Sequence, residues 1–501
     1  MAQPIKNIVI IGGGTAGWMT AASLAKYVNQ HATITLIESS DIATVGVGEA
    51  TIPNIVQFNH NLGIDEVELI KATQATFKLG IQFENWTKTG GSFFHPFADY
   101  GLRIDNVDFH HYLQHANQLG GKHQLDEFSF ACQLAQRGCF AQPHTHPSSP
   151  LADYAYAYHF DAGLYADFLK KFSKNLGVKH VIGTVEDVSL TADTGFIDYV
   201  TLTCGSQYHG DLFIDCSGFE GLLIEKALNT GYEDWSQWLL CDTAIAVQTT
   251  STSEPDPFTR SIAQTAGWQW HIPLQHRTGN GYIFSRRHQS EEEAKALLLA
   301  NIQGTPITTP RTIRFNPGRR KQIWNKNCIA IGLSSGFLEP LESTSISLIQ
   351  TAIAKLLSFF PDMSFNPADI AEVNRLHNSE LEQIRDFLIM HYTLTDKNDS
   401  PFWLDYQNIA LPDGLSHKIA LFKSRGHIAM YDNESFEPSS WLTFYRGYGI
   451  TPKRIDPRAQ AVPADVLQQR LMQMKQSIAT AAQGALSHQA FISQHCLAEK
   501  E

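Results

Sequence analysis

A glycine cluster near the start of the chain is the first group of residues whose type and spacing could do chemistry. Gly12, Gly14 and Gly17 directly follow the apolar run 6–11. Glycines at this spacing let the backbone approach a pyrophosphate at the N-terminus of a helix. The pattern therefore predicts a dinucleotide site in which Thr15 and Ala16, at the start of the helix, lie beside the phosphates.

The elements around these glycines must form a βαβ unit. The run 6–11 is typical of a buried parallel strand, 15–27 of a helix and 33–37 of a second strand. Glu38 follows 21 positions after Gly17, where a ribose hydroxyl needs an acceptor. The unit predicts an adenine dinucleotide, and Glu38 suits FAD and NAD equally.

A tryptophan pair stands in the segment Gly-Trp-Gln-Trp-His-Ile-Pro at 267–273. Alternation places Trp268 and Trp270 on one face of a short extended segment, which Pro273 brings to an end. From the residues alone, the pair could equally be two large anchors of a core strand.

Lys78 lies in the aromatic-rich segment 75–86. A lysine among this much apolar surface is partly desolvated, which makes its nitrogen a better hydrogen-bond partner or nucleophile. The alternative is a surface lysine whose stem packs on apolar neighbours.

Glu342 belongs to the segment Glu-Pro-Leu-Glu-Ser-Thr-Ser at 339–345, which precedes a predicted helix over 343–359. Without further information, the segment indicates a helix N-cap region, where the helix dipole favours carboxylates. The histidines offer another kind of site, since His110, His111 and His115, or His144 and His146, have spacings that could bind a metal. No further set of ligands accompanies them, so we predict no metal.

The rest of the chain completes an α/β (α+β) fold. The run 327–332 is a further strand with a glycine turn, and 366 onward is mainly helical, with a loop-rich interval around 394–415 and a last helix at about 464–482. We expect a FAD-binding, Rossmann-type module at 1–365, with interleaved substrate-site segments at about 75–160 and 220–320. A mainly helical substrate module at 366–501 packs against it.

Composition excludes several classes of protein. The 501 residues carry a net charge of -12, and no run of Lys and Arg offers a nucleic-acid site. No apolar run is long enough to cross a bilayer, and no basic, apolar leader precedes the first strand. The seven cysteines show no paired spacing and indicate buried thiols rather than disulfides. We expect a cytoplasmic protein without nucleic-acid or membrane partners.

Taken together, these motifs resemble the flavin-dependent halogenases of the tryptophan-halogenase type. The resemblance is closest over 5–55, 75–100, 154–168, 211–221, 267–287 and 327–352, and it includes Gly-Val-Gly-Glu-Ala-Thr-Ile-Pro at 46–53. It implies a p-hydroxybenzoate-hydroxylase-like fold, and the strand and turn at 329–335 favour FAD over NAD. Related monooxygenases usually carry Asp where this chain has Leu333, a departure that matches halogenases.

The resemblance also implies a role for individual residues. Lys78 would hold hypohalous acid or form a haloamine with it, and Glu342 would polarise that acid or remove the ring proton. Trp268 and Trp270 would keep the substrate away from the flavin. The remaining residues would bind small molecules: FAD at Gly12, Gly14, Thr15, Ala16, Gly17, Glu38, Ala50, Val185, Leu333 and Ile346; halide at Thr344 and Ser345; the substrate ring at His95 and Phe97.

The implied reaction is an electrophilic aromatic substitution. Reduced FAD (FADH2), supplied by a separate NAD(P)H-dependent flavin reductase, and oxygen would oxidise chloride or bromide to hypohalous acid, which then halogenates an electron-rich ring. Ser345 stands where tryptophan halogenases usually have Gly, which leaves the halide preference undecided, and a homodimer is compatible with the sequence.

The substrate and two other functions stay open at this point. The C-terminal segment 441–449 does not match the one that binds the amino-acid part of tryptophan in its halogenases, so we expect indole, a substituted indole or another electron-rich arene. A flavin-dependent aromatic monooxygenase (hydroxylase) would use the same fold without needing Lys78 or the tryptophan pair. A non-catalytic flavin-binding protein would need neither Lys78 nor Glu342.

Overall fold

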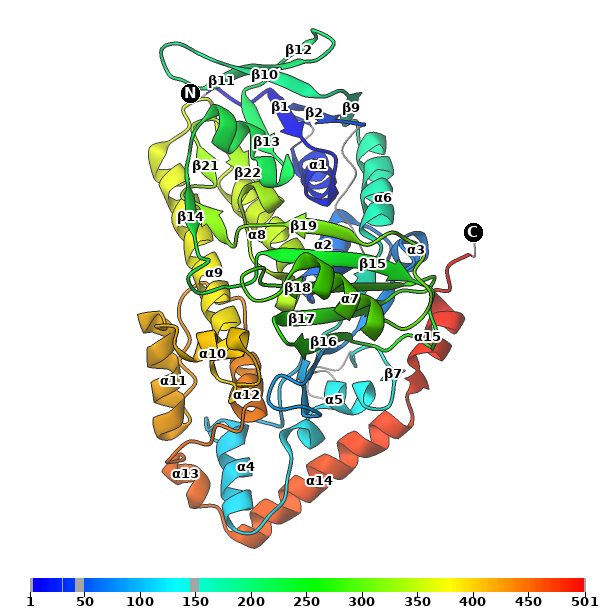
Figure 1. Ribbon diagram of the computed structural model, residues 1–501, viewed down its shortest axis with the longest axis vertical. Coiled ribbons are helices and arrows are strands. Elements are labelled where there is room, and N and C mark those ends of the chain that lie inside the picture. Colours follow the sequence, from blue (N-terminus) through cyan, green and yellow to red (C-terminus); the bar gives the residue numbers. More distant parts are fainter. Residues whose placement is uncertain (1–2, 29, 41–48, 145–152, 500–501) are drawn as a thin grey trace. The chain divides into compact units, whose positions relative to one another are not determined.

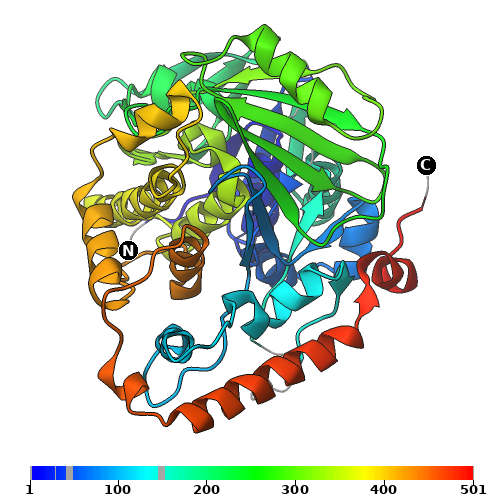
Figure 2. The same cartoon turned by 60° about the horizontal axis from the view of Figure 1, so that its bottom comes forward.

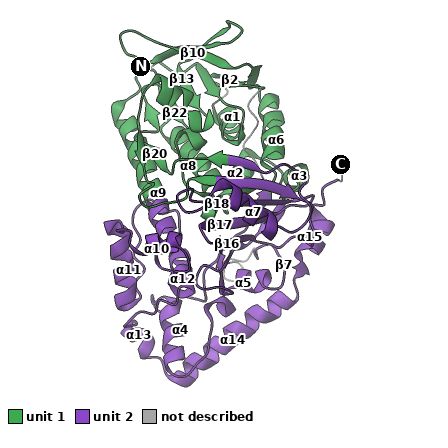
Figure 3. Ribbon diagram, viewed as in Figure 1, with its two compact units in different colours: residues 1–75, 160–243, 313–382 green, residues 76–159, 244–312, 383–501 purple. Residues whose placement is uncertain are grey.

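A computed structural model describes residues 3–28, 30–40, 49–144 and 153–499 (Figure 1). Part of the loop at 46–53, namely 46–48, and His146 lie outside these residues. The chain divides into two compact units, one of residues 1–75, 160–243 and 313–382, the other of 76–159, 244–312 and 383–501 (Figure 3).

The first unit is built on the predicted βαβ unit. Its six-stranded sheet has the order β21-β22-β13-β1-β2-β9. All neighbours are parallel except the pair β21 and β22. The strands are β1 (Asn7–Ile11), β2 (Thr33–Glu38), β9 (Lys179–Ile182), β13 (Leu212–Asp215), β21 (Trp324–Asn325) and β22 (Cys328–Ala330). The two predicted strands and the helix α1 (Thr15–Tyr27) between them are confirmed.

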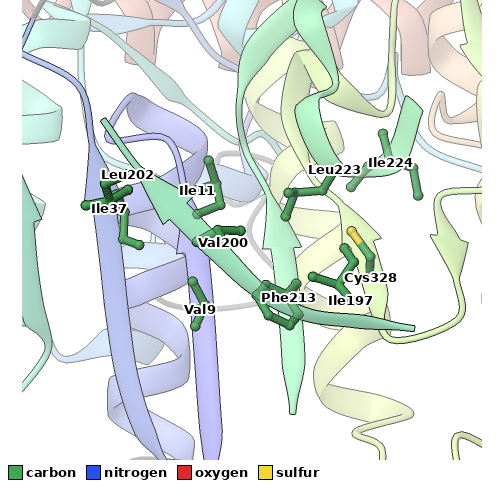
Figure 4. Close-up of a cluster of buried hydrophobic side chains, with 11 residues drawn as sticks. Val9, Ile11, Ile37, Ile197, Val200, Leu202, Phe213, Leu223, Ile224 and Cys328 are labelled. Carbon is green, nitrogen blue, oxygen red and sulfur yellow. The ribbon is translucent and has the colours of Figure 1, made fainter. Parts of the chain in front are cut away.

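Helices and a β-ribbon cover this sheet. Helix α1 contacts α6 (Ala162–Asn175) and α8 (Ser345–Ser358), and α8 also contacts α2 (Asn54–Leu62). The antiparallel ribbon β10 (Val185–Leu190), β11 (Ile197–Leu202) and β12 (Gln207–His209) contributes to a buried apolar cluster with the sheet (Figure 4). The cluster also takes in the turn η4 (Leu222–Ala227). Because the strands are apolar on both faces, both faces must be covered in this way.

The remaining elements of the first unit are short. They include α3 (Glu66–Ala72) and a three-stranded sheet of order β14 (Tyr232–Asp234), β20 (Gly318–Arg320) and β23 (Gly336–Phe337). They also include the 3₁₀ turns at Gly218–Glu220, Gly332–Ser334 and Pro340–Glu342.

The second unit contains a seven-stranded sheet of order β19-β15-β18-β17-β16-β5-β6. Its strands are β5 (Gly80–Glu84), β6 (Ser92–Pro96), β15 (Thr243–Thr249), β16 (Thr259–Gln264), β17 (Gly267–Pro273), β18 (Thr278–Phe284) and β19 (Arg311–Arg314). Helix α7 (Glu291–Asn301) contacts β18. Two short strand pairs accompany the sheet: β4 (Thr76–Lys78) with β8 (Ala157–Phe160), and β7 (Cys139–Phe140) with β24 (Leu486–Ser487).

Helices make up the rest of this unit. The elements are α4 (Phe109–Gln118), the 3₁₀ turn η1 (Leu125–Phe128), α5 (Phe130–Ala135), α10 (Pro401–Gln407), α11 (Asp413–Arg425), α12 (Pro438–Gly447), α13 (Pro457–Gln460), α14 (Ala464–Gln483) and α15 (His488–His495). The long helix α14 runs along α4 and α5 (Figure 2). None of the helices within the described ranges is long and apolar enough to cross a membrane.

Three expectations from the sequence differ from the structure. The boundary between the units falls at 382/383, inside α9 (Pro367–Thr393), rather than at 365/366. Of the segments expected to be interleaved, 76–159 and 244–312 cluster with the helical C-terminal part, whereas 220–243 and 313–320 belong to the first unit. The interval 394–415 contains α10, which buries Phe402, Trp403 and Tyr406 and is too short to show a clear period. All seven cysteines are free as predicted, but Cys204 is exposed and Cys139 is only partly buried.

We predict that Gly12→Ala lowers the free energy of unfolding by about 1–3 kcal/mol from the backbone conformation alone. Gly12 has φ +112°, and an added Cβ would clash with the carbonyl oxygen of Cys216. Gly14→Ala is the matched control, because Gly14 has φ -76° and no atom of the described residues lies within 4 Å of its added Cβ. Urea unfolding of both variants tests this, and equal stabilities would contradict it.

Candidate active site

The glycine turn of the first unit presents an uncapped helix N-terminus. Gly14 is the N-cap of α1 with no side-chain hydrogen bond, and the first turn of α1 holds no acid. The close packing behind it needs glycine, since a Cβ at Gly17 would clash with the carbonyl oxygen of Gly12. The backbone N–H groups at this end are thus available to a phosphate, which the helix dipole also favours.

Glu38 lies beside this turn at the end of β2. An added Cβ at Gly13 would overlap its carboxylate, so only glycine fits there. Its Oε1 accepts hydrogen bonds from Lys170 Nζ and His180 Nε2, both at 2.7 Å. Burial raises the pKa of Glu38, but the hydrogen bonds and charges of Lys170 and His180 outweigh this and hold it below its ordinary value. The carboxylate is therefore ionised, as an acceptor for a ribose hydroxyl must be.

The turn after β22 reaches the same helix end. Gly332 has φ +82°, and its added Cβ would lie 2.7 Å from the Cβ of Ala16. Leu333 belongs to this turn, and the Ser334 hydroxyl donates a hydrogen bond to the carbonyl oxygen of Asp215. The structure thus brings the two predicted cofactor segments together. The helix end, the ionised Glu38 and this glycine turn fit the adenosine and pyrophosphate parts of FAD.

The other predicted cofactor residues lie in varied surroundings. Ala50 and Ile346 are buried, the first in the short strand β3 (Glu49–Ala50) and the second in the first turn of α8. Val185 packs against the apolar cluster of Figure 4. The contact of each with a flavin stays a prediction.

The predicted halide site stands at the start of α8. Thr344 is its N-cap and Ser345 its first residue, and no acid lies in its first turn. The hydroxyl oxygen of Thr344 is buried and has no hydrogen-bond partner among the described residues. Ser343 adopts φ +59°, which turns the chain sharply between Glu342 and the helix. Glu342 itself is 1% exposed. An unpaired hydroxyl at a helix N-terminus is suited to an anion.

In the second unit, Lys78 is a buried cation beside an aromatic ring. It ends β4, its side chain is fully buried, and its Nζ lies 5.1 Å from the centre of the Phe97 ring. The interpretation as a surface lysine is therefore wrong, because both faces of β4 are covered. A cation over a ring face is stabilised by the ring quadrupole, more strongly when desolvated.

His95 lies on β6, and Phe97 is the first residue after that strand. His95 is 2% exposed and makes an edge contact with Phe444 at 5.2 Å between ring centres. The backbone N–H of Phe97 donates to Leu79, and its carbonyl accepts from Ala155. Phe97 is only half-buried, so its ring is the more accessible of the two.

The tryptophan pair lies on β17 as the alternation predicted. The ring centres of Trp268 and Trp270 are 6.1 Å apart, and both residues are buried. Trp270 pairs with Gly281 on β18, where an added Cβ would overlap the indole. The glycine opposite Trp270 makes room for its indole. The position of Trp270 therefore depends on a glycine at 281 in the neighbouring strand.

The predicted residues divide between the units. The first unit contains Glu342 and the residues predicted to bind FAD and halide. The second unit contains Lys78, His95, Phe97 and both tryptophans. Lys170 and His180, which hold Glu38, were not found from the sequence, because they lie more than a hundred positions from it and in no motif. His110 and His111, considered as metal ligands, contact Gly426 and Asp456 instead. The described residues contain no group of three or more His, Cys, Asp or Glu arranged for a metal.

Comparison with known proteins decides the family. The profile of the family described as tryptophan halogenase matches residues 7–464. The chain belongs to the tryptophan halogenase family. Tryptophan 7-halogenase RebH of Lentzea aerocolonigenes is 36% identical over 498 residues, which cover 92% of this chain and 93% of RebH.

Solved structures of flavin-dependent halogenases are similar to this chain over nearly the whole length of both. BrvH from Brevundimonas sp. BAL3 is 44% identical, with a TM-score of 0.95 over 98% of this chain and 99% of BrvH. Xcc4156 from Xanthomonas campestris is 43% identical, with a TM-score of 0.96 over the whole of both chains. The predicted fold class is confirmed, and the halogenase interpretation is favoured over the hydroxylase and the non-catalytic protein.

Buried histidines of the second unit make the fold sensitive to acid. Burial lowers the pKa of His271 and of His488 to about 4, and it lowers the pKa of His159 well below 6.5. The unfolded chain then binds more protons than the folded one between pH 6.5 and 4. The contribution of these neutral histidines to the free energy of unfolding is complete above pH 6.5 and is lost as the pH falls toward 4. Asp126, whose pKa burial raises to about 6, acts in the opposite direction.

We therefore predict that acidification from pH 7 to 5 lowers the free energy of unfolding, with His488 contributing about 2 kcal/mol of the loss. In His488→Gln this loss should be smaller by that amount, since an amide does not titrate. Urea unfolding at both pH values measures it. An unchanged pH dependence in the variant would contradict the assignment.

Proposed function

We propose that this protein is a flavin-dependent halogenase that places chlorine or bromine on an electron-rich aromatic ring, with indole or a substituted indole as substrate. Family membership supports the reaction type. The observation that carries the proposal for this chain is the full burial of Lys78 against the Phe97 ring. Burying the ammonium of a lysine costs desolvation energy, and family resemblance gives this buried group a role in holding the halogenating species.

FAD fits the first unit through the uncapped N-terminus of α1 and the ionised Glu38. When bound in its reduced form, it supplies with oxygen the oxidation of halide to hypohalous acid. We propose that the N-terminus of α8 holds the halide, with the Thr344 hydroxyl and the backbone N–H groups as donors. A separate NAD(P)H-dependent flavin reductase would provide the reduced cofactor.

The chain's own residues then direct the substitution. Lys78 Nζ donates a hydrogen bond to the oxygen of hypohalous acid, so that the oxygen–halogen bond breaks toward the ring and the oxygen leaves as water with a proton from Lys78. In the alternative route, Lys78 as a neutral amine takes the halogen as a haloamine, with release of water, and passes it to the ring. The ring carbon gains halogen and must lose its proton to recover aromaticity, and we propose the Glu342 carboxylate as the acceptor of that proton. Phe97 and His95 hold the ring by aromatic packing. Trp268 and Trp270 exclude the arene from the flavin.

The C-terminal segment supports a substrate without an amino-acid group. RebH is named for its action on tryptophan. In this chain the segment 441–449 forms the end of α12, where Trp441, Phe444 and Tyr445 are buried by neighbouring aromatic rings. These side chains are occupied in packing. We propose on this basis that indole is preferred to free tryptophan. Family membership separately supports the proposal that the enzyme works in the cytoplasm.

The proposal predicts a halogenated product. The protein is mixed with FAD, a flavin reductase, NADH, oxygen and indole, with bromide in one sample and chloride in another. Mass spectrometry should show a bromine or chlorine isotope doublet that disappears in Lys78→Ala and persists in the exposed-site control Lys88→Ala. A product heavier by one oxygen and without halogen would refute it.

Glu342→Gln is predicted to slow ring halogenation by about 10²–10⁴-fold, the usual contribution of a positioned acid or base. Hypohalous acid formation, measured with a bromination-sensitive dye, should change little, because the proton is lost only after the halogen has added. An equal loss of both activities would place Glu342 in the oxidation of halide instead.

A further inference from the structure

Two buried histidines surround the strand that carries Lys78, and the reaction proposed above assigns neither of them a role. The first is His159 on β8, directly opposite Thr76 on β4. Its Nδ1 lies 3.0 Å from the Thr76 hydroxyl oxygen and its Nε2 lies 2.9 Å from that of Thr259. Both ring nitrogens of a fully buried imidazole are therefore used.

The hydrogen bonds fix the tautomer of His159. The Thr76 hydroxyl donates its only proton to the carbonyl oxygen of Pro273, at 2.7 Å. Its oxygen must then accept from His159, so Nδ1 carries the imidazole proton. The Nε2 atom is left as an acceptor for the Thr259 hydroxyl. Burial, and next the charge of Lys78, lower the pKa of His159 well below 6.5, which keeps the ring neutral.

The second histidine is His488, the first residue of α15. Its Nε2 accepts a hydrogen bond of 3.0 Å from the backbone N–H of Phe77, the residue before Lys78. Because Nε2 is an acceptor, the proton is on Nδ1, which donates to the carbonyl oxygen of Pro255 at 2.9 Å. Among the described residues, β4 is an edge strand that pairs with β8 alone, so the backbone of β4 faces away from β8 without a neighbouring strand, and His488 accepts from it there.

These contacts connect Lys78 with the tryptophan pair. Pro273, which accepts from Thr76, is the last residue of β17, the strand of Trp268 and Trp270. Thr259 begins β16, which pairs with β17 along its length. Phe77 adds packing, with its ring stacked on Phe140 at 4.1 Å and edge-on to Phe491 at 5.3 Å. The position of Lys78 relative to the indoles thus depends on a few defined hydrogen bonds.

We propose that His159 and His488 are positioning residues for Lys78, which hold β4 from its side chain at Thr76 and from its backbone at Phe77 through neutral imidazoles of fixed tautomer. The inference rests on the proposed role of Lys78. A displaced Lys78 would leave hypohalous acid formation intact and impair only its delivery to the ring. Displacements of about 1 Å can cost roughly 10²-fold in rate.

His488→Leu and His488→Gln form the test, because a glutamine amide offers an acceptor and a donor about as far apart as those of the imidazole. His495→Leu is the control on the same helix, at an exposed position. Each variant is assayed with FAD, flavin reductase, NADH, oxygen, bromide and indole. Bromoindole, the KM for indole and hypobromous acid release to a dye are measured.

The inference predicts that His488→Leu forms bromoindole at least about tenfold more slowly, with KM and hypobromous acid release within about twofold of the parent. His488→Gln should regain most of the rate, and His495→Leu should match the parent. Parental bromination by His488→Leu would overturn the inference. The inference would also be overturned if His488→Gln formed bromoindole as slowly as His488→Leu. A fall of hypobromous acid release in parallel with bromoindole formation would overturn it too.

Two further variants make the result decisive. If His488→Leu does not fold, Thr76→Val takes its place, with the same expected and overturning results, because it removes only the hydroxyl between His159 and Pro273. Lys78→Ala separates the two proposals. Parental bromination by Lys78→Ala would refute the role of Lys78 itself, whereas an inactive Lys78→Ala beside a fully active His488→Leu would refute only the positioning role.

Discussion

The parallel pairing of β1 with β2 on one side and β13 on the other is the constraint on which the first unit depends. It brings the carboxyl ends of the three strands to one edge of the sheet, where Gly12, Glu38 and Asp215 follow or end them. The buried Asp215 carboxylate accepts hydrogen bonds from the backbone of Leu223 and Ile224 and so fixes the turn beyond β13. The edge becomes a site because helix N–H groups and an ionised acceptor meet there.

Burial of charge is the corresponding constraint in the second unit. Lys78 is fully buried, and its surroundings contain a ring face at Phe97 and histidines that burial keeps neutral. Neutral imidazoles satisfy polar groups without adding a second positive charge. Had His159 been protonated, two cations would share a region of low dielectric, at a cost of several kcal/mol. The strand geometry and the electrostatics therefore favour the same protonation states.

The aromatic residues around the C-terminal helices pack against one another. Phe387 stacks on Phe436 at 3.8 Å and meets Trp441 edge-on at 4.9 Å. Trp441 in turn lies 4.1 Å from the ammonium of Lys418. Side chains that pack against one another in this way leave few polar groups for a ligand.

The sequence by itself determined the βαβ unit, the cofactor turn and the extended tryptophan segment. Glycine spacing and alternation are local properties, since each depends on backbone sterics within a few residues. Motif resemblance likewise supplied the proposed roles of Lys78 and Glu342 without any coordinates. Only the tertiary structure decided what surrounds them. Lys170 and His180 reach Glu38, and His488 reaches Phe77 from 411 positions away, through contacts that no local pattern encodes. The short helix α10 and the unit boundary inside α9 were decided in the same way, because burial depends on which distant elements pack together.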